Sequence, residues 1–411
     1  MNITAIDIGT TKICVIIASI NTKGVIEILG IGQHPSHGLK KGVVVNIAKT
    51  VESLEFAIKQ AEEMAGIKIE KACVGISGGH IQSRNSTGVV AVKNKTITQY
   101  DIDRVIEAAK AIPIQQDQEI LHVLPQYFRV DGQEQVLDSK GMFGVRLEAQ
   151  VHIVTGAIAS AQNIIKSCEL AGLDVSDIVL EQIASAQAVL TPFEKELGVG
   201  ILDIGGGTSD FAIYKDGRIR HSKVIPFAGN HFTNDLAIGL GIPLEKAEEI
   251  KKQYATVSPL HIQQQHNKFI DIDLGYNDGI KTIEVGLASE MLRFRAEEII
   301  DILIDEILDN TLKNAMPAGL VLTGGGCLLP GFKEIIAQHL GIPVRIGYPQ
   351  ETQKNSPYTI PDALKSPIYS TAFGLLLYAI NEKNFFGAHC TNHSMFGKIF
   401  GKMKSWLYDF F

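Results

Sequence analysis

The stretch VGILDIGGGTSDFAIYKDGRIRHSKVIPF, residues Val199 to Phe227, decides the fold. An apolar segment leads into DIGGGTSD (Asp203–Asp210), a second apolar segment follows, and Asp216-Gly217 precedes a third. Asp-Gly between two strand-like runs is a strong hairpin signal. We therefore predict a strand, a glycine-rich turn, a second strand, a tight turn and a third strand.

The same order opens the chain. ITAIDIG is followed by DIGTTK (Asp7–Lys12) and then by KICVIIASI and VIEILGIG, again as strand, glycine turn, strand and strand. Internal similarity at about half the length of the chain predicts two related α/β domains. Helical patterns at Ile47–Met64, at Gln182–Leu190 and in a long run ending at Asn314 supply the expected connections.

Two segments interrupt this duplicated plan. Residues from about 81 to 151 read as an insert with its own helix, Gln99–Ala111, and strands. A second insert, from about 229 to 291, contains a charged helix, Leu244–Tyr254, and two strands. Residues 382–394 (EKNFFGAHCTNHS) have no clear periodicity and are typical of a linker.

Composition excludes several classes of function. The net charge of −7 gives no basic field, so we expect no nucleic-acid partner. The five cysteines are scattered without metal-type spacing, which favours free thiols in a reducing cytoplasm. The apolar run Ile13–Ile20 is too short to span a bilayer, and no signal peptide is visible.

Both glycine loops have the composition of a phosphate-binding turn. Glycines let backbone N–H groups approach an anion, and threonine hydroxyls add donors. Asp7 and Asp203 open the loops, where they could hold Mg²⁺ or its waters. A single loop would fit an ordinary β-turn equally well, but two in matching positions indicate a site. The candidate residues are Asp7, Gly9, Thr10, Thr11, Lys12, Asp203, Gly205, Gly206, Gly207, Thr208 and Asp210.

A third glycine cluster lies in TGGGCLLPGF, Thr323–Phe332. Gly324, Gly325 and Gly326 follow an apolar strand and could let the backbone pass close to a base or ribose. The alternative is a tight strand-to-helix turn without a ligand. The cluster is neither a Walker A loop nor GxGxxG, so it supports neither a P-loop NTPase nor a Rossmann dehydrogenase.

The order DIGTTK, EQIASAQAVL (Glu181–Leu190), DIGGGTSD, TGGG and STAFGLLLYA (Ser370–Ala379) resembles the actin, Hsp70 and sugar-kinase superfamily. The chain is most similar to the bacterial FtsA family over nearly its whole length. Segments that carry this resemblance are GLKKGVVVN (38–46), VGISGGHIQS (74–83), ILHVLPQYF (120–128) and GMFGVRLEAQVHIVTG (141–156). Departures are small: Asn46 stands where the family usually has Asp, and Gln182 where Pro is common.

The resemblance implies duplicated actin-like (RNase H-like) α/β domains around an ATP cleft, with two inserted subdomains and a C-terminal amphipathic helix. The expected boundaries are 1–81, 161–196 and 367–381 for domain I (subdomain 1A), 82–160 for inserted subdomain 1C, 197–228 and 301–366 for domain II (subdomain 2A), 229–300 for inserted subdomain 2B, 382–394 for the linker and 395–411 for the helix.

The resemblance also implies ATP and Mg²⁺ as cofactors, with slow hydrolysis or none. Glu181 is the candidate to orient a hydrolytic water, because related ATPases carry a carboxylate or amide on this connection. Its alternative role is an ion pair or a helix-start carboxylate. A small-molecule kinase of the same superfamily and an FtsA-like pilus-assembly scaffold remain alternative functions, although neither has an obvious use for the tail.

Partners are likewise implied by the resemblance. The second insert, about 229–300, would receive the C-terminal peptide of FtsZ, and Arg293 could pair with an acidic peptide. Self-association into filaments and contacts with later division proteins are expected. The location would be the cytoplasmic face of the membrane at the division site, as a peripheral protein.

The tail MFGKIFGKMKSWLYDFF, Met395–Phe411, has strong helical amphipathicity. At the helical period, eight apolar residues fall within an arc of about 140°. We predict an interfacial helix that binds anionic lipids; the alternative is a helix docked on the protein's own core. The predicted membrane-binding residues are Met395, Phe396, Ile399, Phe400, Met403, Trp406, Leu407 and Phe410 on the apolar face, with Lys398 and Lys402 on the polar face.

Overall fold

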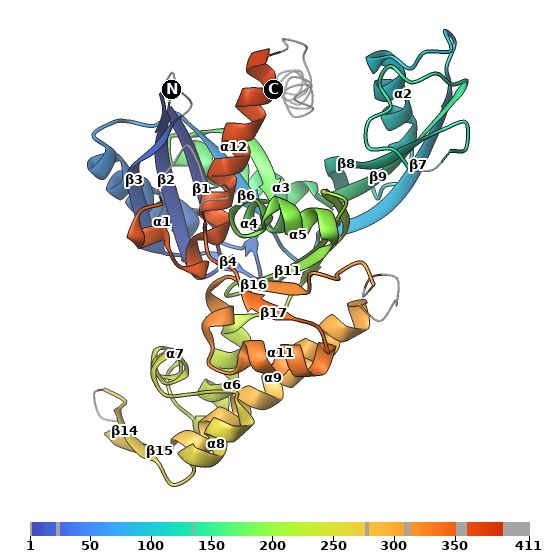
Figure 1. The fold of residues 1–411 in the computed structure, drawn as a ribbon. Helices are drawn as coiled ribbons and strands as arrows, with labels where there is room; N and C mark the ends of the chain where they lie inside the picture. The colour runs from blue at the N-terminus through green and yellow to red at the C-terminus, as the bar shows by residue number, and fades with distance from the viewer. Residues whose placement is uncertain are drawn as a thin grey trace.

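The computed structural model describes residues 2–21, 25–133, 135–275, 279–307, 312, 314–350 and 360–388. Within them, two stacked domains are each built on a five-stranded sheet, and a smaller unit projects from each (Figure 1). This arrangement agrees with the predicted duplicated α/β fold with two inserts.

The sheet of domain I has the strand order β10-β6-β1-β2-β3. Strands β1, β2 and β3 form an antiparallel meander, and β6 and β10 extend it in parallel. Their bounds are Asn2–Ile8 (β1), Lys12–Ile20 (β2), Ile26–Pro35 (β3), Lys71–Ile76 (β6) and Asp174–Leu180 (β10).

The sheet of domain II repeats that order as β17-β16-β11-β12-β13. Here β11, β12 and β13 form the meander, and β16 and β17 are the parallel extension. The predicted hairpin turn is present: Asp216 and Gly217 have φ of 55° and 70°, the left-handed geometry such a turn needs. The bounds are Val199–Ile204 (β11), Ser209–Lys215 (β12), Arg218–Ile225 (β13), Leu320–Thr323 (β16) and Val344–Ile346 (β17).

The strands carry apolar side chains on both faces of each sheet, and helices pack against both faces. In β11, Val199 and Ile201 join the core that contains α4 and α12, whereas Leu202 and Ile204 join the core around α9 and α11. The side chain of Asn46 caps helix α1 (Ile47–Ala65) by accepting a hydrogen bond from Lys49 N–H, so Asn performs here the capping role that Asp can perform in the family. The helices are α1 (Ile47–Ala65), α3 (Ile158–Leu170), α4 (Glu181–Val189), α5 (Pro192–Leu197), α9 (Val285–Ile307), α11 (Phe332–Leu340) and α12 (Ser370–Ala388).

Subdomain 1C is the first projecting unit. It is a three-stranded antiparallel sheet of order β7-β9-β8, covered by α2, with an apolar core of its own (Figure 1). The bounds are Gln82–Ala91 (β7), Gln99–Ala109 (α2), Gln118–Val130 (β8) and Arg146–Ala157 (β9). The sequence did not identify β7, because its residues QSRNSTGVVA are mostly polar.

Subdomain 2B is the second projecting unit and carries the two predicted strands, β14 (Phe269–Asp273) and β15 (Ile280–Glu284). Its helices are α6 (Gly229–Leu240), α7 (Leu244–Gln253) and α8 (Pro259–Gln265). A short hairpin, β4 (Leu39–Lys40) and β5 (Val43–Val44), lies between β3 and α1 in domain I.

The C-terminal boundary needs a correction. Helix α12 continues to Ala388, so residues 382–388 of the predicted linker are helical. The predicted amphipathic helix, 395–411, lies outside the described residues, as does part of the long helix predicted to end at Asn314. No helix among the described residues is both long and apolar enough to cross a membrane.

Candidate functional site

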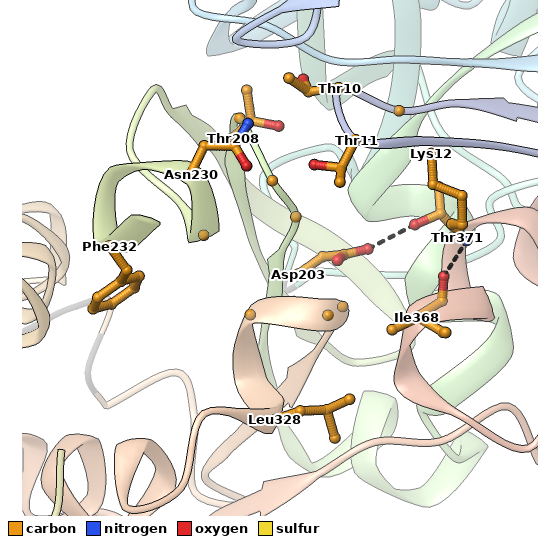
Figure 2. A pocket seen from close by; sticks show the side chains of 18 of the residues that line it. Thr10, Thr11, Lys12, Asp203, Thr208, Asn230, Phe232, Leu328, Ile368 and Thr371 are labelled. Carbon is orange, nitrogen blue, oxygen red and sulfur yellow. Dashed lines mark hydrogen bonds between the residues drawn. The ribbon is translucent and has the colours of Figure 1, made fainter. Parts of the chain in front are cut away.

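A pocket of about 580 Å³ lies between the two domains, and both glycine hairpins border it (Figure 2). Every residue predicted from the two hairpins and from the TGGG loop lines this pocket, and so does Glu181. Residues that the sequence did not single out complete the lining: Gln33, Pro35, Gly229, Asn230, Phe232, Glu248, Lys251, Lys252, Leu328, Leu329, Pro330, Ile368 and Thr371.

The two hairpins have the same local geometry. In the first, Gly9 N–H donates to Lys12 O at 3.0 Å; in the second, Gly205 N–H donates to Thr208 O at 2.9 Å. Asp7 pairs with Cys14 across its hairpin, and Asp203 pairs with Asp210 across the other. The two turns are therefore repeats of one structure that face each other from opposite domains.

The tips of the hairpins are in contact. A Cβ atom added at Gly206 would lie 1.8 Å from Thr11 Oγ1, and one added at Gly207 would lie 2.4 Å from Thr10 Oγ1. Asn230 N–H, at the start of α6, donates to Gly206 O at 2.8 Å and fixes the second tip from behind. Both glycines are thus required by the close approach of the other hairpin.

Asp203 connects the second hairpin to the helices between the domains. Its Oδ2 accepts from the Ser185 hydroxyl on α4. The same oxygen accepts, at 2.8 Å, from Thr371 Oγ1 on α12 (Figure 2). Asp210 accepts from Ser77 Oγ, at the end of β6, at 2.6 Å. These bonds tie the second hairpin to three elements of domain I.

Buried carboxyl groups are concentrated at the hairpins. Burial raises the pKa of Asp7 to about 6, with Lys12 opposing and Asp203 adding to the shift. Burial likewise raises the pKa of Asp203 and brings that of Asp210 to about 7. Lys12 Nζ lies 3.9 Å from Asp7 Oδ2 and donates to Ile368 O at 2.5 Å. The group as a whole carries more acid than base and would gain from a bound cation.

Glu181 is the first residue of α4, so the helix-start position proposed as its alternative role is where the structure places it. Burial raises its pKa well above the ordinary value, and Asp210, Asp7 and Asp203 add to the shift. Its side chain also lines the pocket. The position is compatible with either role.

The TGGG loop forms another wall of the pocket, next to the second hairpin. Gly324 has φ of 79°, and a Cβ atom there would lie 2.3 Å from Asp203 Oδ1. A short 3₁₀ turn, η2 (Gly325–Leu328), follows and brings Leu328 to the pocket. The loop is therefore the tight turn of the alternative interpretation and a pocket wall at the same time.

Helix α7 supplies a polar wall that sequence reasoning missed. Lys251 Nζ lies 2.6 Å from Glu248 Oε2, 2.8 Å from Thr233 Oγ1 and 3.1 Å from Gly229 O. Burial lowers the pKa of Lys251, although Glu248 opposes the shift. In the sequence these residues belong to a charged run, and only their spacing of three, one helical turn, hints that they share a face.

Arg293 lies on α9, outside the pocket. Its NH1 lies 2.5 Å from Glu297 Oε1, and its guanidinium stacks on the Phe294 ring at 4.8 Å from the centroid. Phe294 is 61% exposed, so the pair presents an apolar ring next to a cation on the surface of domain II.

Comparisons with known proteins agree with this architecture. The family description "SHS2 domain inserted in FTSA" matches residues 78–155, and "Cell division protein FtsA" matches residues 200–374. The chain is 43% identical to the cell division protein FtsA of Pseudomonas aeruginosa, over 93% of this chain and 90% of that one.

Solved structures extend the comparison. The PilM-PilN type IV pilus biogenesis complex contains a chain similar over 92% of this one and 98% of its own, with a TM-score of 0.67 and 16% identity. MreB5 of Spiroplasma citri bound to ADP is similar over 94% and 99%, with a TM-score of 0.55 and 14% identity. At these identities the likeness shows the fold alone.

The duplicated sheets, the facing hairpins and the inserted SHS2 domain define an actin-like protein. Within that class the chain belongs to the FtsA family of cell division proteins, as the resemblance of its motifs predicted. Its role is thus that of an actin-like cell division protein, and neither the small-molecule kinase nor the pilus scaffold is needed as an alternative.

Proposed function

We propose that this protein binds ATP with Mg²⁺ between its two hairpins, polymerises on the cytoplasmic face of the membrane at the division site and tethers FtsZ filaments there, where later division proteins join. The observation that carries the nucleotide part is the meeting of two equivalent glycine hairpins at one pocket. The contacts with FtsZ and the membrane rest on membership of the family and on the sequence of the tail.

The hairpins supply the chemistry that a polyphosphate needs. Backbone N–H groups at the glycines, the hydroxyls of Thr10, Thr11 and Thr208, and the ammonium of Lys12 all border the pocket. The phosphates would lie in the pocket against both hairpin tips. Hydrogen bonds from both domains would then converge on one ligand.

The carboxyl groups fit Mg²⁺. Carboxylate oxygens are ligands that this cation prefers, and a cation would favour the ionised forms of Asp7 and Asp203. Among the described residues, no group of three or more His, Cys, Asp or Glu could hold a metal ion. The two aspartates would therefore share Mg²⁺ with phosphate and water, and bound Mg²⁺ would offset the charge on the phosphates.

The nucleoside would lie at the other end of the pocket. Leu328, Leu329 and Pro330 give one apolar wall, and Glu248 and Lys251 on α7 face the same space. Flat apolar contact with polar groups at the edge suits a base and its ribose. The Glu248 carboxylate is an acceptor for ribose hydroxyls in this arrangement.

Glu181 is the proposed residue for orienting water. Its raised pKa means that the group holds its proton to higher pH than an ordinary glutamate, which makes it a poor base until a bound cation restores its charge. We therefore propose slow turnover. Glu181→Gln should leave ATP binding intact and lower the already slow hydrolysis; equal hydrolysis in both proteins would remove Glu181 from this role.

FtsZ is proposed to dock on the second insert and the start of α9, where the half-buried Arg293 lies beside the exposed Phe294 ring. An acidic peptide with apolar residues would pair with the guanidinium and cover the ring. Arg293 also pairs with Glu297, one helical turn away, and because both side chains are in partial contact with water this ion pair could be exchanged for one with a carboxylate of the peptide at small cost.

The tail is proposed to lie in the headgroup region of the membrane. Each large apolar side chain contributes up to about 1.5–3 kcal/mol on full burial, and each lysine near anionic lipid about 1 kcal/mol. The cost of ordering the chain, together with Gly397 and Gly401, weakens the helix. One tail would bind reversibly, and many tails on one filament would bind tightly through effective concentration.

Isothermal titration of the full chain with MgATP tests the nucleotide part. We expect one site per chain, with affinity lowered at least tenfold in Lys12→Met because the cation beside the phosphates is lost. Lys49→Met, an exposed lysine on α1, is the matched control and should bind as the wild type does. Absence of binding in the wild type would contradict the proposal.

A further inference from the structure

Subdomain 1C, although inserted in domain I, also contacts domain II. Its strands β7, β8 and β9 lie against β13, the edge strand of the domain II sheet. Strand β13 has a bulge at this point, because its pairing with β12 skips Arg220 between His221 and Ile219. A bulge re-aims backbone groups of an edge strand. We use the name β13 contact for residues 219–222 of β13 and the 1C side chains that touch them, which are Ser83, Asn85, Gln126 and His152.

The β13 contact consists of hydrogen bonds to backbone groups of β13. Gln126 Nε2 donates to Ile219 O at 3.0 Å and to Arg220 O at 3.1 Å. Asn85 Nδ2 donates to Arg220 O at 3.3 Å, and Ser83 Oγ donates to Ser222 O at 2.6 Å. Side chains of 1C thus satisfy the carbonyl groups that an edge strand leaves unpaired.

His152 connects the same side chains to one another. Its Nδ1 lies 2.7 Å from Asn85 Oδ1, and its Nε2 lies 2.8 Å from Ser222 Oγ. Asn85 Oδ1 also lies 3.2 Å from Gln126 Nε2, whose two hydrogens are shared among this oxygen and the Ile219 and Arg220 carbonyls. Burial lowers the pKa of His152 to about 3, so the ring is neutral and has one N–H. With that proton on Nδ1 the donors and acceptors match, because Ser222 then donates to Nε2.

The attachment of 1C to domain I is of a different kind. Ile81, Leu121 and Val154, at the base of 1C, belong to the apolar core of domain I. His122 Nε2 accepts from Leu180 N–H at 3.1 Å, next to Glu181. Apolar packing tolerates small shifts, whereas hydrogen bonds weaken steeply with misalignment. A rotation of domain II would therefore leave 1C with domain I and break the β13 contact.

The β13 contact and the hairpins are joined through short covalent and hydrogen-bonded paths. Strand β12 begins at the second hairpin and pairs with β13, with Ala212 opposite Ser222. From domain I, Ser77 donates to Asp210 at 2.6 Å, and the chain runs from Ser77 directly into β7 and Ser83. The same relative position of the domains thus satisfies the contacts at the hairpins and at β13.

We propose that the β13 contact is a releasable latch: it holds domain II and 1C in the arrangement in which the hairpins face each other, and its release loosens 1C and weakens nucleotide binding. The link to nucleotide rests on the proposed function. Coupling between sites is reciprocal, so bound nucleotide must in turn tighten the β13 contact.

Gln126→Met tests the latch, because methionine has a similar size and no donor. Arg84→Ala, an exposed position on β7 between Ser83 and Asn85, is the control. In the full chain, spin labels at Glu107→Cys on α2 and Lys333→Cys on α11, with Cys390→Ser, report the distance between 1C and domain II. We expect the distance distribution to broaden in Gln126→Met and to remain as in the wild type in Arg84→Ala.

The second measurement is the dissociation constant for MgATP in the same variants. Gln126 Nε2 donates to Ile219 O and Arg220 O, and the loss of these bonds should weaken MgATP binding roughly 3- to 10-fold in Gln126→Met and leave it unchanged in Arg84→Ala. Ser83→Ala, a smaller change with a smaller effect in the same direction, replaces Gln126→Met if that protein does not fold.

Each outcome decides the question. An unchanged distance distribution in Gln126→Met and Ser83→Ala would overturn the latch. A broadened distribution with unchanged affinity would overturn its coupling to nucleotide. If the wild type itself bound no nucleotide, the proposed function would fail, and the distance measurement would still decide whether the latch exists.

Discussion

Thr11, at the tip of the first hairpin, lies so close to Gly206, at the tip of the second, that a Cβ atom on residue 206 would come within 1.8 Å of the Thr11 hydroxyl oxygen. The two residues belong to different domains and are 195 positions apart in the chain. Their contact defines where the two halves of the duplicated fold meet, and a ligand that bridges the hairpins must enter there.

Gly206→Val should abolish ATP binding while both domains still fold. The added side chain would occupy the space of the Thr11 hydroxyl and push the hairpins out of register, and valine leaves no room for a phosphate beside the backbone. We expect an affinity reduced at least 100-fold by titration, with an unchanged circular dichroism spectrum. Gly79→Val, at an exposed glycine where an added Cβ atom would come no nearer than 3.7 Å to another residue, controls for valine itself. ATP bound with unchanged affinity would refute the assignment of the pocket.

Asp210→Asn should change the pH dependence of stability. The folded-state pKa of Asp210 is about 7, above the unfolded value near 4, so the wild type must ionise a buried group as pH rises through this range and loses stability. Asparagine stays neutral and can still accept from Ser77. In nucleotide-free buffer we expect the variant to melt about 4 °C above the wild type at pH 8 and close to it at pH 5.

The control for this prediction is Asp138→Asn, an exposed aspartate of 1C. It should follow the wild-type melting temperature at both pH values. If Asp210→Asn showed the same pH slope as the wild type, Asp210 would already be ionised in the folded protein, and the assignment of a pKa raised by burial would be wrong.

Arg293→Glu should weaken binding of the FtsZ C-terminal peptide. The substitution reverses the charge beside Phe294, which an acidic peptide would then avoid, and we expect a roughly 5- to 10-fold loss in fluorescence anisotropy titrations. Arg146→Glu, an exposed arginine of 1C, should bind the peptide as the wild type does. A protein without residues 395–411 should also bind it normally. Loss of binding on deletion of the tail would show that anchor and receptor are not separate.

Trp406→Glu and Lys402→Glu separate the two contributions to membrane binding. Glutamate at 406 puts a charge in the middle of the apolar arc, so co-sedimentation with anionic vesicles should disappear at any salt concentration. Glutamate at 402 leaves the arc intact and should reduce sedimentation mainly at low ionic strength. Both variants should bind ATP normally. A melting temperature several degrees lower for Trp406→Glu in lipid-free buffer would mean that the tail is a core helix.

Much of the fold was predictable because it follows from local sequence patterns. The hairpins at Asp7 and Asp203 both open with Asp-Ile-Gly and both lie between apolar strands, so the sequence reveals the duplication without any knowledge of packing. The helix Ile47–Ala65 begins with a capping Asn46 and ends before Gly66, and both are signals of the chain itself. The pocket followed from the hairpins once their domains were expected to face each other.

The parts that were not predictable depend on tertiary structure. Strand β7 has a polar sequence because its side chains bond to β13, more than 130 residues away, and no local pattern encodes that partner. Thr371 and Ile368 reach the pocket only because α12 and the turn before it return to domain I beside the first hairpin. Glu248 and Lys251 resemble a solvated helix face until α7 is placed against the pocket.

Electron microscopy of the full chain on anionic lipid monolayers with MgATP tests the central claim most directly. We predict filaments on the monolayer with the wild-type protein, none with Gly206→Val, and none when residues 395–411 are removed. A bare monolayer with the wild type, or equal coverage by wild type and Gly206→Val, would contradict the account of a nucleotide-dependent, membrane-bound polymer.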